Sequence, residues 1–89
     1  MTIHRHPNFK KAYKNRVAND QKLIVKIKKR IEYFVNNPSH PLLRDHALTG
    51  TKKGLRAFSV TGDIRIVYRW IESHTIELLT IGTHNQVYN

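Results

Sequence analysis

The chain has 89 residues, a length that fits one folded domain, and we expect that domain to span residues 1–89. It has no cysteine, which excludes disulfides and thiolate metal sites. Its apolar runs are too short to cross a bilayer, and its first residues lack the apolar segment of a secretory signal. We therefore expect a cytoplasmic protein without membrane contact. The formal net charge of +10 favours a polyanionic partner such as nucleic acid, with an acidic protein partner or plain solubilising charge as the alternatives.

The first half of the chain predicts two helices. A first helix is expected from about Pro7 to Arg16, because proline suits a first helical turn and apolar residues follow at helical spacing. Asp20 with its neighbour Asn19 offers a cap for a second helix, whose apolar stripe runs through residues 23–35. Pro38 disfavours helical geometry in the residue before it, so this helix should end by Asn37. The short connection predicts that the two helices pack antiparallel.

The second half of the chain predicts a sheet. Residues 38–54 are polar and contain proline and glycine, which indicates a loop. Residues 55–60, 64–71 and 75–81 are rich in β-branched and aromatic residues, and their short connections make them antiparallel neighbours, with Thr2–His4 as a possible edge strand. We therefore predict an α+β fold in which an N-terminal helical hairpin packs on one face of a small twisted antiparallel β-sheet.

The alternation of side chains along the strands bears on function. Because the helices cover one face only, the arginines of the strands are expected on the open, concave face, where they would meet a polyanion. The alternative is that these charges only solubilise the protein. Just after the last strand come His84 and Tyr88, and strand ends are positions where side chains meet ligands while the backbone stays fixed.

Several short motifs in the second half resemble one protein family. They are residues 43–50 (LRDHALTG), 53–56 (KGLR), 62–68 (GDIRIVY) and 81–84 (IGTH), followed by Tyr88. In this order and spacing they resemble the RelE/ParE toxin superfamily, most closely its YafQ-type branch. The resemblance implies a small RelE-like toxin of a type II toxin–antitoxin system, held inactive by an acidic antitoxin protein. Most RelE-like and YafQ-like members cut mRNA on the ribosome, whereas the ParE branch poisons DNA gyrase.

RNA can be cut without a metal ion or cofactor, because its own 2′-hydroxyl attacks the adjacent phosphate while side chains move two protons. Histidine suits this task near neutral pH. His84 matches the histidine of the family's GTH element and is the first candidate for proton transfer, and His46, in the predicted loop, is the second. Their alternatives are a polar residue at a strand end and an ordinary surface histidine.

Two further residues are candidates by resemblance. Asp63 matches an aspartate that acts as a base or orients a histidine, although an ordinary turn aspartate explains it equally well. Tyr88 matches the aromatic residue that closes the active site, and its alternative is a frayed chain end. The phosphate-binding candidates are basic residues near these positions: Lys52, Lys53, Arg56 and Arg65.

One position departs from the family pattern. The YafQ-type pattern has another histidine where this chain has Ser59, and a serine hydroxyl does not transfer protons near pH 7. The remaining histidines are scattered without the spacing of a zinc site, so we expect no metal. An endoribonuclease is thus the leading interpretation, with a gyrase-inhibiting toxin or a catalytically degenerate binding module on the same fold as alternatives.

Overall fold

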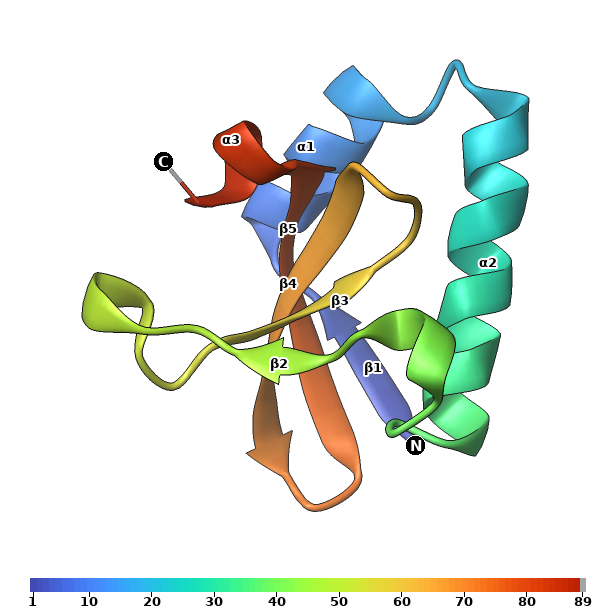
Figure 1. The fold of residues 1–89 in the computed structure, drawn as a ribbon. Coiled ribbons are helices and arrows are strands. Elements are labelled where there is room, and N and C mark those ends of the chain that lie inside the picture. The colour runs from blue at the N-terminus through green and yellow to red at the C-terminus, as the bar shows by residue number, and fades with distance from the viewer. Residues whose placement is uncertain (89) are drawn as a thin grey trace.

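The computed structural model describes residues 1–88, so Asn89, the last residue of the predicted domain, lies outside the described part (Figure 1). Its helices, 3₁₀ turns and strands in chain order are β1 (Thr2–Arg5), α1 (Pro7–Arg16), α2 (Gln21–Asn36), η1 (Pro41–Leu43), β2 (His46–Ala47), η2 (Gly50–Lys52), β3 (Arg56–Ser59), β4 (Ile64–Glu72), β5 (Thr75–Thr83) and α3 (His84–Tyr88).

Helices α1 and α2 begin where the sequence predicts. Pro7 occupies the first turn of α1, and the His6 side chain caps it by accepting a hydrogen bond from the Asn8 amide at 3.0 Å. The Asp20 carboxylate caps α2 through the Leu23 amide at 3.0 Å. Helix α2 ends two residues before Pro38, as expected. Within residues 1–88, no helix is both long enough and apolar enough to span a bilayer.

The sheet has the strand order β1-β5-β4-β3-β2 and is mixed. The pairs β2–β3, β3–β4 and β4–β5 are antiparallel, as their short connections require. The edge strand β1 instead runs parallel to β5, so the prediction of a purely antiparallel sheet was wrong for this strand. Since β1 pairs with a strand more than seventy residues later in the sequence, no hairpin turn fixes its direction. Helix α1, which follows β1, also packs against β5.

Both predicted helices pack on the same face of the sheet, which confirms the α+β architecture. Helix α1 lies against β5, whereas α2 reaches β3 and β4 through Phe34. The Phe34 ring lies 5.2 Å from that of Phe58, 5.0 Å from that of Tyr68 and 5.7 Å from that of Trp70. We had expected the two helices to pack along each other. Direct contact between α1 and α2 is instead sparse, and the two helices cover different parts of the sheet (Figure 1).

The opposite face of the sheet is only partly open, because the short helix α3 folds back over β4 and β5. Val87 of α3 packs with Ala57, Val67 and Leu79 in a second, smaller apolar cluster. Thr83 and Gln86 start this helix by reciprocal capping, in which the Gln86 side-chain oxygen accepts from the Thr83 amide at 2.8 Å and Thr83 Oγ1 accepts from the Gln86 amide at 3.3 Å. The sequence prediction missed α3, and this helix carries two of the four catalytic candidates.

Candidate functional site

A hollow of about 300 Å³ lies between α3 and the segment that leads into β3. Two of the predicted catalytic residues, His84 and Tyr88, reach it from α3, and His46 reaches it from β2. Lys52 lines it from η2. We call it the His46–His84 hollow, and its lining residues are His46, Ala47, Leu48, Thr49, Lys52, His84 and Tyr88. The fold thus brings together two imidazoles that are far apart in the sequence.

His84 and Tyr88 are held together by the helix. Residues four apart lie on one face of a helix, and here the two rings meet edge to face with their centroids 4.5 Å apart. The Tyr88 hydroxyl is buried and has no hydrogen-bond partner within residues 1–88. Burial raises the pKa of this hydroxyl, and the positive charge of nearby Arg65 partly opposes that rise. Tyr88 is therefore packed into the site rather than frayed.

His46 lies on the short strand β2, not in a loop as the sequence had suggested. Strand β2 pairs His46 with Ala57, which fixes the backbone at the edge of the sheet. The ring nitrogen Nδ1 lies 3.0 Å from the carbonyl oxygen of Arg44. Because a carbonyl oxygen only accepts hydrogen bonds, Nδ1 carries the proton, and Nε2 of the neutral ring keeps a free lone pair. The strand pairing and this contact therefore hold both the backbone and the ring of His46 in place.

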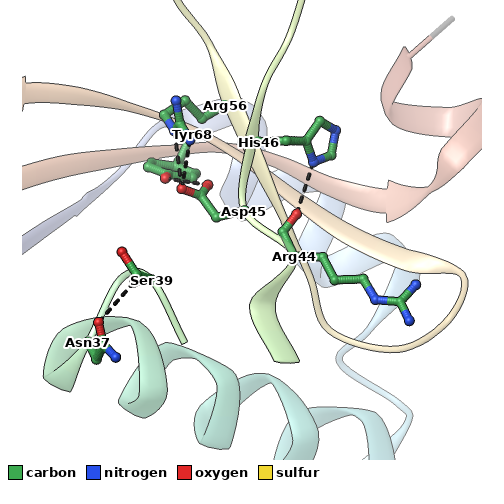
Figure 2. A network of polar contacts seen from close by, with 7 residues as sticks. All are labelled: Asn37, Ser39, Arg44, Asp45, His46, Arg56 and Tyr68. Carbon is green, nitrogen blue, oxygen red and sulfur yellow. Dashed lines mark hydrogen bonds and ion pairs between the residues drawn. The ribbon is translucent and has the colours of Figure 1, made fainter. Parts of the chain in front are cut away.

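A polar network anchors the chain directly before His46, as Figure 2 shows. The Asp45 carboxylate accepts hydrogen bonds from the Tyr68 hydroxyl at 2.6 Å and from Arg56 Nη2 and Nε at 2.9 and 3.2 Å. The bond to Asp45 raises the pKa of Arg56, and burial, foremost, raises the pKa of Tyr68. Asp45 and His46 point to opposite sides of the chain, so the network holds the backbone from which His46 projects (Figure 2).

The two predicted phosphate-binding arginines lie on opposite faces of the sheet. Arg56 pairs across the strands with Tyr68, which packs under the helices, whereas Arg65 pairs with Ser59 on the face that carries α3. Paired residues in neighbouring strands share a face. The expectation that both arginines line one open face was therefore wrong for Arg56, whose guanidinium is bound to Asp45.

Asp63 and Lys53 lie outside the hollow. Asp63 is exposed in the β3–β4 turn, where Thr61 Oγ1 accepts hydrogen bonds from the amides of Asp63 and Ile64 at 3.2 and 2.9 Å. Ile64 pairs with Thr83, the residue before His84, so Asp63 sits at the same end of the sheet as His84. Lys53 is exposed, and only its neighbour Lys52 reaches the hollow.

Ser59, which replaces the family histidine, is buried beside Arg65. Its hydroxyl lies 3.4 Å from Arg65 Nη1, and its carbonyl oxygen accepts a hydrogen bond from Arg30 Nη1 at 3.3 Å. With serine here, the imidazoles available for proton transfer at this site are those of His46 and His84. Within the part of the chain that the structure describes, no three His, Asp, Glu or Cys side chains are grouped in a way that would hold a metal ion.

Sequence reasoning missed the residues that position the site. Asp45 stands directly before His46 in the same motif, and its place before a candidate histidine was the available signal. Arg44 adopts the left-handed conformation, with φ 48° and ψ 39°, where it ends η1 and turns its carbonyl toward the His46 ring. No signal in the sequence identifies this conformation, because arginine rarely adopts it.

Comparison with known proteins gives a consistent result. The family model described as "Bacterial toxin of type II toxin-antitoxin system, YafQ" matches residues 1–89. A metal-bound toxin from Helicobacter pylori is 27% identical, with a TM-score of 0.78 and 98% of each chain covered. YafQ from E. coli is 22% identical, with a TM-score of 0.77, 98% of this chain and 97% of that chain covered. In the YoeB–YefM complex from Staphylococcus aureus, the matching chain is 19% identical, with a TM-score of 0.76, 94% of this chain and 97% of that chain covered. No match was found among curated proteins.

Proposed function

We propose that this chain, which belongs to the YafQ family of bacterial toxins of type II toxin–antitoxin systems, is a metal-independent endoribonuclease that cuts mRNA on the ribosome. The observation that carries the proposal is that His46 and His84, which are far apart in the sequence, line one hollow together with Lys52 and Tyr88. Cleavage of RNA needs one group to accept a proton and another to donate one, at a site that attracts phosphate.

In this mechanism, His46 Nε2 removes the proton from the 2′-hydroxyl. The other ring nitrogen, Nδ1, donates its hydrogen to the Arg44 carbonyl oxygen, so Nε2 is the nitrogen with the free lone pair. The 2′-oxygen attacks the adjacent phosphorus, the bond to the 5′-oxygen breaks, and the products are a 2′,3′-cyclic phosphate and a free 5′-hydroxyl. His84, in its protonated form, gives its proton to the leaving 5′-oxygen.

Basic residues stabilise the negative charge that builds up on the phosphate. Lys52 lies on the wall of the hollow, and Arg65 lies close enough to Tyr88 for its charge to act on the tyrosine hydroxyl. Tyr88 closes the site and stacks on a base or bonds the phosphate through its buried hydroxyl. Asp63, at the same end of the sheet, orients His84 when RNA is bound.

The natural partner in the cytoplasm is an acidic antitoxin protein. One protein of similar fold, from Staphylococcus aureus, has been solved as a YoeB–YefM complex. A chain of net charge +10 attracts a partner of opposite charge. We propose that the antitoxin covers the face that carries α3 or displaces α3, which would block the His46–His84 hollow or take it apart.

Induction of the protein in bacteria, followed by mapping of mRNA ends, tests this function. The wild type should arrest growth and cut mRNA at defined sites, and His84→Ala should abolish both effects. His74→Ala, which changes an exposed histidine in the β4–β5 turn, is the matched control and should leave both unchanged. Growth arrest with DNA breaks and intact mRNA would instead identify a gyrase-inhibiting toxin. No arrest and no cuts from the folded wild type would identify a degenerate binding module.

A further inference from the structure

A second hollow, of about 290 Å³, lies between α2 and the β3–β4 turn. Four of its lining side chains are cationic, and none is acidic. Lys26 and Arg30 come from α2, Arg44 follows η1, and Arg65 comes from β4. We call it the basic hollow, and its other lining residues are Leu42, Ser59, Val60, Thr61 and Gly62.

The charges of the basic hollow are not neutralised inside the protein. The ion pairs of residues 1–88 are Arg56–Asp45 and Arg69–Glu77, so none of the four cations takes part in one. Bringing four like charges to one hollow is electrostatically unfavourable unless an anion occupies it. The basic hollow therefore has the composition of an anion site.

One of the four cations is held firmly in place. Arg30 Nη1 donates to the carbonyl oxygens of Leu42 at 2.5 Å and Ser59 at 3.3 Å, which ties α2 to η1 and to the edge of β3. Arg65 is placed by the β-sheet and lies beside the Ser59 hydroxyl. Lys26 and Arg44 are exposed at the rim and are free to close on a ligand.

The basic hollow adjoins the His46–His84 hollow through two residues. Arg44 lines the basic hollow with its side chain while its backbone carbonyl holds the His46 ring. Arg65 lines the basic hollow, and its charge acts on Tyr88, which lines the other hollow. Arg44 and Arg65 therefore link the basic hollow to residues of the His46–His84 hollow.

We propose that the basic hollow binds a backbone phosphate of the same RNA strand, one or more nucleotides away from the phosphate that is cut. This inference rests on the proposed function and assigns it a second phosphate subsite, formed by Lys26, Arg30 and Arg44, with Arg65 shared between the two subsites. Because every nucleotide of RNA carries a phosphate, this contact is independent of base sequence and contributes affinity and register rather than base specificity.

Binding of a non-cleavable RNA isolates this contact from catalysis. The probe is a single-stranded oligonucleotide of about ten residues with 2′-O-methyl groups throughout, and the variant is Lys26→Gln combined with Arg44→Gln. Both side chains are exposed and make no side-chain hydrogen bond within residues 1–88, so the fold should survive. The matched control is Lys28→Gln combined with Arg5→Gln, which removes the same charge from the outer side of α2 and from the far edge strand β1.

The K26Q/R44Q variant should bind the RNA about three- to tenfold more weakly than the charge-matched control. The slope of log affinity against log salt should fall by about 0.7 for the lost phosphate contact. A dinucleotide with a single phosphate should bind both proteins alike, because it does not reach the second subsite.

Equal affinities and equal salt slopes for K26Q/R44Q and the control would overturn the inference. Weaker binding of the antitoxin at unchanged RNA affinity would overturn it too, because it would assign the basic hollow to a protein partner. Cleavage of unmodified RNA by the wild type, measured separately, decides the proposed function. Failure of the second subsite and failure of the nuclease proposal are therefore distinguishable.

Discussion

Replacement of Asp45 by alanine tests whether the polar network beside His46 holds the site. The carboxylate accepts a hydrogen bond from the Tyr68 hydroxyl at 2.6 Å and two from the Arg56 guanidinium. Tyr68 is fully buried, so its hydroxyl would lose its partner without gaining water. The Arg56 side chain is 35% exposed, so its charge would still reach solvent.

These contacts set the size of the effect. An unpaired buried hydroxyl costs about 1–3 kcal/mol, and loss of a partly exposed ion pair adds at most about 1 kcal/mol. We therefore expect Asp45→Ala to reduce the free energy of unfolding by about 1–4 kcal/mol, which lowers the Tm of a domain of this size by roughly 4–30 °C. Asp45→Asn keeps an acceptor for Tyr68, and its loss should be about half as large.

Differential scanning calorimetry and urea unfolding measure this loss. Glu77→Ala is the matched control, because it removes a carboxylate from the Arg69–Glu77 pair, in which the Arg69 side chain is 54% exposed. The control should lose at most about 1 kcal/mol. If Asp45→Ala destabilised the protein no more than Glu77→Ala does, the network would not be what anchors β2. Under conditions where Asp45→Asn is folded, its RNA cleavage should be slower than that of the control, because the backbone carrying His46 is loosened.

Three further substitutions probe the other parts of the account. A Cβ on Gly82 would lie 2.6 Å from Gln86 Oε1 and 3.0 Å from Gln86 Cβ, so Gly82→Ala should break the Gln86 cap on the Thr83 amide and lower both Tm and cleavage. Gly62→Ala, with open space around it, should retain both. Burial, foremost, raises the pKa of Tyr68 above its ordinary value of 10, so the folded state keeps this proton to a higher pH than the unfolded state does. The free energy of unfolding should therefore fall as pH rises above about 10, by up to about 1.4 kcal/mol per pH unit. In Tyr68→Phe, urea unfolding between pH 10 and 12 should show a shallower decline, and an unchanged slope would contradict this account. Since the Tyr88 hydroxyl is buried without a partner within residues 1–88, Tyr88→Phe should leave the Tm equal or higher, so any loss of cleavage reports a role of the hydroxyl in the reaction.

Local signals were sufficient to predict much of the fold. The first helix was predicted from a proline at its start and the second from an aspartate cap, and the strands from runs of β-branched and aromatic residues. These features act between residues close in sequence, so a single chain reveals them. His46 and His84 were candidates for proton transfer because they match the family motifs, and in the structure both line one hollow.

The remaining features depend on contacts between distant segments. Arg56 was expected beside Arg65, but its binding to Asp45 follows from the pairing of β3 with β4, which puts Arg56 on the same face as Tyr68. Helix α3 was missed because five residues after a strand carry little helical periodicity, and only the pairing of Thr83 with Gln86 signals its start. The parallel direction of β1 could not be predicted, because no local turn links this strand to β5.

The chemistry of the RNA ends tests the central claim most directly. Purified protein is incubated with unmodified single-stranded RNA in EDTA, with and without ribosomes, and the new ends are analysed by mass spectrometry. We expect 2′,3′-cyclic phosphate and 5′-hydroxyl ends from the wild type, and none from folded His46→Ala or His84→Ala. Intact RNA in both reactions, or cleavage that persists at the same rate in both histidine variants, would contradict the proposal that these two imidazoles cut RNA.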